Sequence, residues 1–175
     1  MISAKSQHGK DTIAKLMQEQ LEQNGKKVLI IHFADPVKWL AHDFFNWDGN
    51  KDVEGRKLLQ TLGTEIMRKH FPTYWADIIA KFIAATKKWD YILIPDWRFE
   101  NEFETIYKYN PFVITIRINS FNSDGSQFFN PNMTLEQRLH ISEWELDNFP
   151  FEWIIDNRGT IEDLNESIQT ILEHI

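Results

Sequence analysis

The sequence predicts an α/β protein of three layers, in which a central parallel sheet is covered by helices on both faces. Apolar strand segments alternate along the chain with amphipathic helical segments, which is the pattern of parallel β-α-β units. The segment 27–33 is almost continuously apolar, as is typical of a strand buried on both faces of a sheet. The chain has 175 residues, 42% of them hydrophobic, so one domain with a sizeable core is expected.

The composition limits which classes of binding partner and which cellular compartment we expect. The net charge of −7 disfavours binding to nucleic acid or to an acidic membrane surface, so any basic site must be local. The chain has no cysteine, which excludes disulfides and thiolate metal sites and fits a reducing compartment. We find no apolar run long enough to span a bilayer and no signal peptide. We therefore expect a cytoplasmic protein whose partners are small molecules, with no nucleic acid and no membrane.

An N-terminal segment, residues 4–12 (AKSQHGKDT), has the features of a phosphate-binding loop that opens onto a helix. Converging backbone N–H groups and the helix N-terminus would hold a triphosphate, and Lys10 would reach its β and γ phosphates. The usual pattern G-x-x-x-x-G-K-[ST] is changed, because Ala4 replaces the first glycine and Asp11 precedes the hydroxyl of Thr12. The alternative interpretation is an ordinary turn followed by a helix that Asp11 caps.

The segments after this loop supply the first helices and a strand. We predict a helix over residues 11–24, a buried strand over 27–33 and a second helix that begins near Asp35 and Pro36. Asp35 suits the cap of that second helix, and Pro36 suits its first turn.

A third helix, predicted over residues 55–70, has two different faces. One face is apolar and carries Leu58, Leu59, Leu62 and Ile66. The opposite face repeats a polar side chain every four residues, at Arg56, Gln60, Thr64 and Arg68. Such a stripe is either a solvated face or a recognition surface for a phosphate and a base edge, and its two arginines favour recognition. Another helix is predicted over residues 74–87.

The strand predicted over residues 89–96 ends in Asp96. Ligands of open α/β sheets bind beyond the carboxyl ends of the strands, so this carboxylate is a candidate Mg²⁺ partner or proton acceptor. The alternative is a cap for the helix that follows. Arg98, Asn101 and Glu102 come directly after it.

A polar segment, residues 119–133, follows a strand predicted over 112–118 and is too long for a simple connection. We predict that it is a lid, which with the helical segment behind it extends over residues 119–138. Arg117 and Arg138 flank it and are candidates for neutralising charge when the lid closes. An exposed arginine at a strand end is an equal alternative for Arg117.

A last strand over residues 151–156 and a helix over 160–174 complete a single domain, residues 1–175. The helices between residues 36 and 88 interrupt the alternation of strands and helices. Residues 36–88 are therefore predicted to be an inserted, substrate-binding region beside the phosphate loop.

Six short motifs occur in order along nearly the whole chain. They are Gly9-Lys10-Asp11-Thr12, Phe33-Ala34-Asp35-Pro36-Val37-Lys38, Trp47-Asp48-Gly49 with Lys51-Asp52, Arg56 with Leu59-Gln60 and Gly63-Thr64-Glu65, Asp96-Trp97-Arg98-Phe99 with Asn101-Glu102, and His140-Ile141-Ser142-Glu143. Together they resemble the phage-type deoxynucleoside monophosphate kinases, a branch of the P-loop nucleotide kinases. The spacing of the last motif explains no mechanism by itself.

The resemblance implies a P-loop NTPase fold and transfer of the γ-phosphoryl group of ATP to a deoxynucleoside 5′-monophosphate (dNMP), with Mg²⁺. It also implies a bacteriophage origin, the cytoplasm of the host cell and a homodimer. Catalytic roles are expected for Lys10, Asp11, Asp96 and Arg98. ATP is expected to contact Ala4, Lys5, His8, Gly9, Lys10, Thr12 and Asn157. The acceptor nucleotide is expected to contact Asp35, Lys38, Arg56, Gln60, Thr64, Arg68, Trp75, Asn101, Glu102, Arg138, His140 and Glu143. The expected Mg²⁺ ligands are Thr12, Asp11 and Asp96.

Two other functions stay open at this point. The first is a P-loop kinase for another small acceptor, such as a coenzyme precursor. The second is a regulatory module that binds ATP without turnover, against which the acidic and arginine residues downstream of the loop argue.

Overall fold

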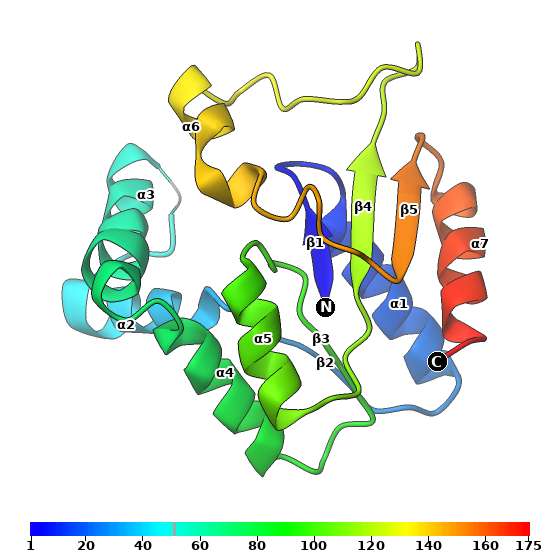
Figure 1. Ribbon diagram of the computed structural model, residues 1–175, viewed down its shortest axis with the longest axis horizontal. Coiled ribbons are helices and arrows are strands. Elements are labelled where there is room, and N and C mark those ends of the chain that lie inside the picture. Colours follow the sequence, from blue (N-terminus) through cyan, green and yellow to red (C-terminus); the bar gives the residue numbers. More distant parts are fainter. Residues whose placement is uncertain (51) are drawn as a thin grey trace.

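A parallel sheet forms the centre of the molecule (Figure 1). The computed structural model describes residues 1–50 and 52–175; Lys51, part of one sequence motif, lies outside them. The strands are β1 (Ile2–Ala4), β2 (Val28–Ile30), β3 (Tyr91–Leu93), β4 (Ile116–Ser120) and β5 (Trp153–Asn157). Their pairings β1-β4-β5 and β2-β3 are all parallel. The Ile2 amide donates to the carbonyl of Ile94 at 2.8 Å, which joins the two parts in the order β2-β3-β1-β4-β5.

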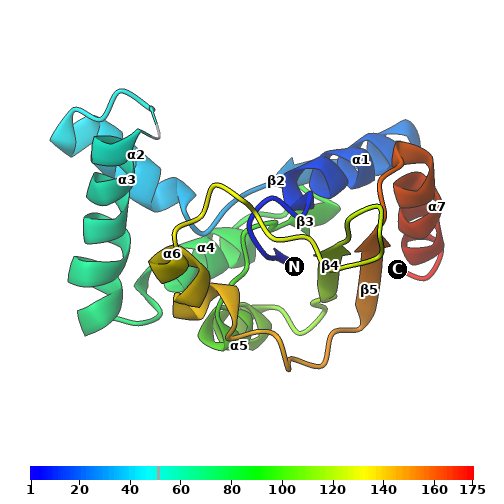
Figure 2. The ribbon, with the colours of Figure 1, turned by 90° about the horizontal axis from the view of Figure 1, so that it is seen from above.

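Helices cover both faces of this sheet (Figure 2). On one face, α1 (Lys10–Gln23) packs beside α7 (Ile161–Leu172), and their buried side chains meet those of β1, β4 and β5. On the other face lie α4 (Tyr74–Ala85) and α5 (Glu100–Tyr109), around the fully buried Trp97. The predicted three-layer arrangement with a central parallel sheet is confirmed.

Three helical segments project from one side of the sheet: α2 (Asp35–Phe45), α3 (Val53–Gln60) and η1 (Thr61–Arg68) (Figure 1). They enclose a small core of Val37, Ala41, Leu62 and Trp75. Trp75 comes from α4, whose Ile79 packs instead in the core beneath the sheet. The part that stands away from the sheet therefore runs from α2 to η1. The division of the chain at residues 36–88 stays a prediction.

The third helix is not a uniform α-helix, because Thr61–Arg68 is a π-helix. A π-helix adds residues to each turn, so side chains five apart, rather than four, come to share a face. Leu62 and Met67 accordingly pack in the small core, whereas Ile66 is 49% exposed. The prediction that Ile66 shares the buried face is wrong for this reason. The Trp75 indole donates to the Gly63 carbonyl at 3.0 Å, which satisfies one acceptor within this segment.

The segment that connects β4 to β5 along the chain passes over the carboxyl ends of the strands. Residues after Ser120 lead to the short helix α6 (Leu135–Leu139), and η2 (Ile141–Glu143), a 3-10 turn, follows it (Figure 1). Strands β2 and β3 are shorter than predicted, since the chain leaves the sheet after Ile30 and Leu93 and continues toward a cavity. No helix of the described residues is long and apolar enough to cross a membrane.

Candidate active site

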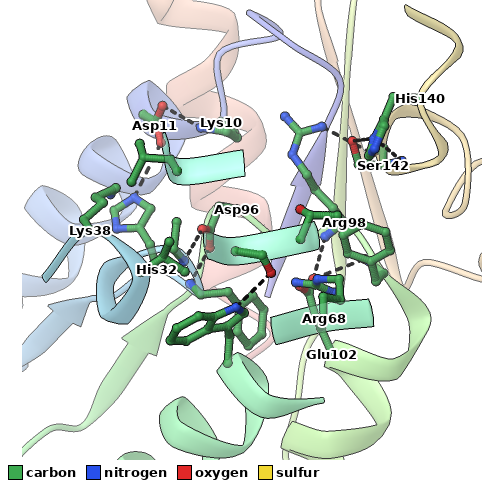
Figure 3. A pocket seen from close by; sticks show the side chains of 18 residues that line it. Lys10, Asp11, His32, Lys38, Arg68, Asp96, Arg98, Glu102, His140 and Ser142 are labelled. Carbon is green, nitrogen blue, oxygen red and sulfur yellow. Dashed lines mark hydrogen bonds and ion pairs between the residues drawn. The ribbon is translucent and has the colours of Figure 1, made fainter. Parts of the chain in front are cut away.

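A cavity of about 490 Å³ opens where β2 and β3 end, between the sheet and the projecting helices. Figure 3 shows its charged side chains in two groups, with Lys10, Asp11, His32 and Lys38 on one side and Arg68, Arg98 and Glu102 on the other. Asp96 lies between these groups. The remaining lining residues are Phe33, Ala34, Val37, Leu59, Gly63, Thr64, Trp75, Phe99, His140 and Ser142. Positive and negative groups from distant parts of the sequence thus face one space.

The phosphate loop reaches the cavity at the start of α1. Gly9 precedes the helix with φ 90°, a left-handed conformation that glycine adopts without strain. No side chain caps α1, so the amides of its first turn are open to an anion. The alternative interpretation of Asp11 as the cap is therefore wrong. Ala4, at the place of the first glycine, ends β1 and is buried, so its methyl group packs in the core.

Asp11 pairs with Lys10 instead of capping the helix. The Lys10 ammonium donates to Asp11 Oδ2 at 2.6 Å, and His32 Nε2 lies 3.8 Å from Asp11 Oδ1. Partial burial opposes ionisation of Asp11, but Lys10 and then His32 outweigh it and lower the pKa of this carboxyl below its usual value. Asp11 is therefore ionised at neutral pH, at the mouth of the phosphate loop.

Asp96 binds the backbone that follows β2. Its two oxygens accept hydrogen bonds from the amides of Phe33 and Ala34, at 2.9 and 3.0 Å. The interpretation of Asp96 as the cap of the next helix is wrong, because α5 begins at Glu100 and the Glu102 carboxylate binds the Phe99 amide there. Asp96 instead connects the ends of β2 and β3 at the floor of the cavity.

Asp35 also has a different position from the one predicted. It lies in the first turn of α2, after the cap residue Ala34, and accepts from the His32 amide at 2.8 Å and from Lys38 Nζ at 2.9 Å. Burial disfavours its ionisation, but Lys38 and the His32 amide together lower the pKa of Asp35. Asp35 does not itself line the cavity among the described residues; it holds two residues that do.

The buried carboxylate of Glu102 binds residues on the side of the cavity where Arg68 and Arg98 lie. Glu102 Oε1 accepts from Arg68 Nη2 at 2.7 Å, and Glu102 Oε2 accepts from the amides of Arg98 and Phe99. Burial raises the pKa of Glu102, and Arg68 opposes that rise. Arg68 Nη1 is buried and has no hydrogen-bond partner in the described part of the chain. This cavity-lining arginine therefore has one unsatisfied donor, which makes it a candidate ligand-binding group.

The family model of deoxynucleotide monophosphate kinases matches residues 44–168, well over half of the chain. The chain belongs to this family. Among curated proteins no relative matches the sequence.

Solved structures of Mycobacterium tuberculosis APS kinase CysC resemble the kinase in fold. A cysteine-to-alanine mutant is 13% identical with a TM-score of 0.50, covering 98% of this chain and 94% of its own. A complex with AMPPNP and APS is 11% identical with a TM-score of 0.48, covering 98% and 93%. The mutant structure supports the three-layer α/β/α fold.

The π-helix changes which residues of the polar stripe face the cavity of the kinase. Leu59, Gly63, Thr64 and Arg68 line it. Arg56 and Gln60, at the preceding turns, are exposed and stand outside the cavity lining. The structure therefore brings only Thr64 and Arg68 of the stripe to the candidate acceptor site, because the extra residue per turn rotates the later positions against the earlier ones.

Arg117 is neither an exposed strand-end arginine nor a free lid arginine, so both interpretations of it are wrong. Its side chain is buried beneath the phosphate loop, where Nη2 donates to Asp147 Oδ1 at 2.6 Å and Nη1 donates to Ser3 Oγ at 3.0 Å. Asp147 Oδ2 also accepts from Lys5 Nζ at 2.8 Å, and Lys5 lies over the Trp144 ring. Lys5 and Arg117 therefore anchor the loop from below through one carboxylate that the sequence did not indicate.

Of the remaining predicted site residues in the described part of the chain, Trp75 lines the cavity, whereas Arg138 lines a second cavity beside the phosphate loop. Thr12 is exposed in the first turn of α1, and Asn157 ends β5 and donates to the His8 carbonyl at 3.4 Å. Asn101 donates to the Pro72 carbonyl, Arg138 donates to the Asn130 carbonyl, and Trp75 supports the Gly63 carbonyl from a buried position. The lid role of residues 119–138 stays a prediction.

Sequence reasoning assigned no site role to His32, Phe99, Ser142 and Asp147, although Phe99 and Ser142 belong to two of the six motifs. His32 also had a visible signal, since it is a polar residue near the end of an apolar strand segment, at the edge where ligands bind. Asp147 lies in an irregular segment between η2 and β5. Its partners Lys5 and Arg117 are 142 and 30 positions away in the sequence.

His8 connects the phosphate loop to the long segment after β4. It is 1% exposed; the Ser120 amide donates to its Nδ1 at 3.1 Å, so Nε2 carries the proton and donates to the Phe128 carbonyl at 3.1 Å. Its side chain therefore faces the protein rather than ATP. Burial lowers the pKa of His8 below its usual value.

We expect acid to destabilise the kinase through His8. Below about pH 6.5 the unfolded chain binds a proton at His8 that the folded protein resists, so stability falls as pH falls, by up to about 1.4 kcal/mol per pH unit until the folded pKa is reached. Urea unfolding at pH 7.5 and 5.5 would show a larger loss in wild type than in His8→Gln. The exposed His70→Gln is the matched control, and equal losses in wild type and His8→Gln would contradict the prediction.

Proposed function

We propose that this kinase transfers the γ-phosphoryl group of ATP to a dNMP across the cavity, from the phosphate loop toward Arg68 and Arg98. The observation that carries the proposal is the convergence of Lys10, Arg68 and Arg98 on one cavity from three distant sequence motifs. Lys10 marks the donor side, because it extends from the uncapped N-terminus of α1. Arg68, with an unpartnered buried nitrogen, marks the acceptor phosphate.

The proposed acceptor nucleoside lies against the projecting helices. Phe33, Val37 and Leu59 supply an apolar wall there, and the Thr64 hydroxyl lies in the same lining. Burial of a planar base against such a wall favours binding, and a hydroxyl adds a directional hydrogen bond. Lys38, held by Asp35, contributes a further positive charge on the donor-facing side.

Catalysis in this proposal consists of positioning and charge stabilisation, since the transferred group has a metaphosphate-like character. Lys10 follows the charge on the β and γ phosphates. Arg98 faces the transferring group from the opposite side of the cavity, and Asp96 holds the turn after β2 so that the donor and acceptor walls keep their separation. Asp96 is also the group that we propose accepts a proton from the acceptor nucleotide.

The residues present fit a Mg²⁺ ion bound mainly by nucleotide. Mg²⁺ prefers oxygen ligands and is usually held by one or two protein groups together with phosphates and water. The ionised Asp11 carboxylate is 62% exposed, Thr12 follows it in the first turn of α1, and no cluster of three or more acidic or histidine ligands occurs within the described residues. Asp11 and Thr12 would hold the ion, with Asp96 through water. When bound, Mg²⁺ neutralises phosphate charge.

The test is an acceptor panel. Purified protein with ATP would be given each common dNMP and NMP and a set of coenzyme precursors. ADP and product formation would be measured with a coupled assay, and ATP binding by calorimetry. We expect turnover with at least one dNMP that disappears in Lys10→Ala protein. Turnover only with non-nucleotide acceptors would favour the coenzyme-precursor kinase, and ATP binding without turnover on any acceptor would favour the regulatory module. The homodimer, the bacteriophage origin and the cytoplasmic location stay predictions.

A further inference from the structure

The run His140-Ile141-Ser142-Glu143 holds Arg98. Arg98 Nη1 donates to the Ser142 carbonyl at 3.2 Å and to Glu143 Oε1. The second oxygen of the same carboxylate, Oε2, accepts from the backbone amide of Ser6 in the phosphate loop at 3.0 Å. The Glu143 side chain is only 9% exposed, so this carboxylate is withdrawn from water and committed to these two partners.

From this bridge we infer that Glu143 is a positioning residue, not a substrate ligand, and that it fixes Arg98 relative to the phosphate loop. The inference rests on the proposed role of Arg98 at the transferring group. One oxygen of Glu143 orients the guanidinium while the other fixes the loop that carries the donor phosphates. The distance between the donor phosphates and Arg98 then depends on one rigid carboxylate.

The bond pattern of Arg98 fits such a role. Among the described residues, the guanidinium makes hydrogen bonds through Nη1 alone, and Arg98 is one of the residues that line the cavity. The Arg98 backbone amide donates to Glu102, which binds Arg68. A continuous path of hydrogen bonds therefore joins the phosphate loop, Glu143, Arg98, Glu102 and the acceptor-side Arg68.

A glutamine cannot replace Glu143 in this arrangement. Its side chain has one acceptor oxygen, and its amide nitrogen is a donor that faces another donor at either Ser6 or Arg98. One of the two connections is therefore lost while the volume of the side chain is kept. An aspartate keeps the charge but is one methylene shorter, so it also reaches only one of the two partners.

The experiment compares Glu143→Gln and Glu143→Asp with wild type under saturating ATP and dNMP. We expect kcat to fall about tenfold in both variants, within the range known for small misplacements of a catalytic group, while KM for ATP and for dNMP changes less than threefold. The matched control is Glu145→Gln, which removes a carboxylate that binds the Glu100 amide outside the cavity lining. Circular dichroism and thermal unfolding would establish that each protein is folded at the assay temperature.

A double-mutant cycle with Arg98→Lys separates this inference from the proposed function. If Glu143 acts through Arg98, the double variant Glu143→Gln/Arg98→Lys will be hardly slower than Arg98→Lys alone. Additive losses, or a wild-type kcat in a folded Glu143 variant, would overturn the inference. Wild-type kcat in Arg98→Lys would instead refute the proposed role of Arg98, whatever the Glu143 variants do.

Discussion

Replacing Lys10 by alanine is expected to lower kcat by roughly two to four orders of magnitude and to leave the fold intact. The expected loss is of the size seen when a preorganised charge at a developing anion is removed. Lys10 is a cavity-lining cation at the N-terminus of α1, whose uncapped amides are the proposed site of the donor phosphates. In the proposed mechanism its ammonium follows the charge that moves on to the β phosphate.

The fold is expected to tolerate this change because the Lys10–Asp11 pair is at the surface. The Asp11 side chain is largely exposed, and exposed ion pairs contribute little to stability. The pKa of Asp11 will rise toward its usual value once Lys10 is gone, which leaves the carboxylate ionised at neutral pH. Steady-state kinetics with far-UV circular dichroism would check both statements, with the exposed Lys15→Ala on the same helix as control. A folded Lys10→Ala enzyme with normal turnover would remove the loop from the mechanism.

Replacing Arg68 by lysine is expected to lower kcat/KM for dNMP roughly 10- to 100-fold, the value of one lost charge-assisted hydrogen bond. Arg68 pairs with Glu102 through Nη2, and its unpartnered Nη1 is the proposed donor to the acceptor phosphate. A lysine has a single ammonium and cannot reproduce this planar fork. The lysine ammonium would stay paired with the buried Glu102, because leaving that carboxylate unpaired costs free energy.

The measurement is the dependence of initial rate on dNMP at saturating ATP, and then on ATP at saturating dNMP. We expect the KM for ATP to change little, since Arg68 lies on the side of the cavity away from Lys10 (Figure 3). A smaller effect is expected for Arg56→Lys, because Arg56 stands outside the cavity lining. Equal effects at Arg56 and Arg68 would mean that both ends of the stripe contact the acceptor, as a straight α-helix would allow, and would contradict the assignment from the π-helix.

Local physical chemistry made much of this protein predictable from its sequence. The apolar segments are long enough to identify strands that need cover on both faces, which leads to a parallel three-layer arrangement. A glycine and a lysine before an amphipathic helix locate the phosphate loop. An acid at the end of an apolar strand places Asp96 at the predicted ligand-binding edge, and in the structure Lys10, Asp96, Arg98 and Arg68 line one cavity.

Only the tertiary structure decided which polar residues face the cavity and which support it. The π-helix that separates Arg68 from Arg56 depends on packing of Leu62 and Met67 and on the Trp75 hydrogen bond, none of which spacing along the chain reveals. Asp147 and Glu143 acquire their roles from partners far away in the sequence: Lys5 and Arg117 for the first, Ser6 and Arg98 for the second. Periodicity predicts the face of a helix, but the counter-charge of a buried side chain is set by whatever the fold brings next to it.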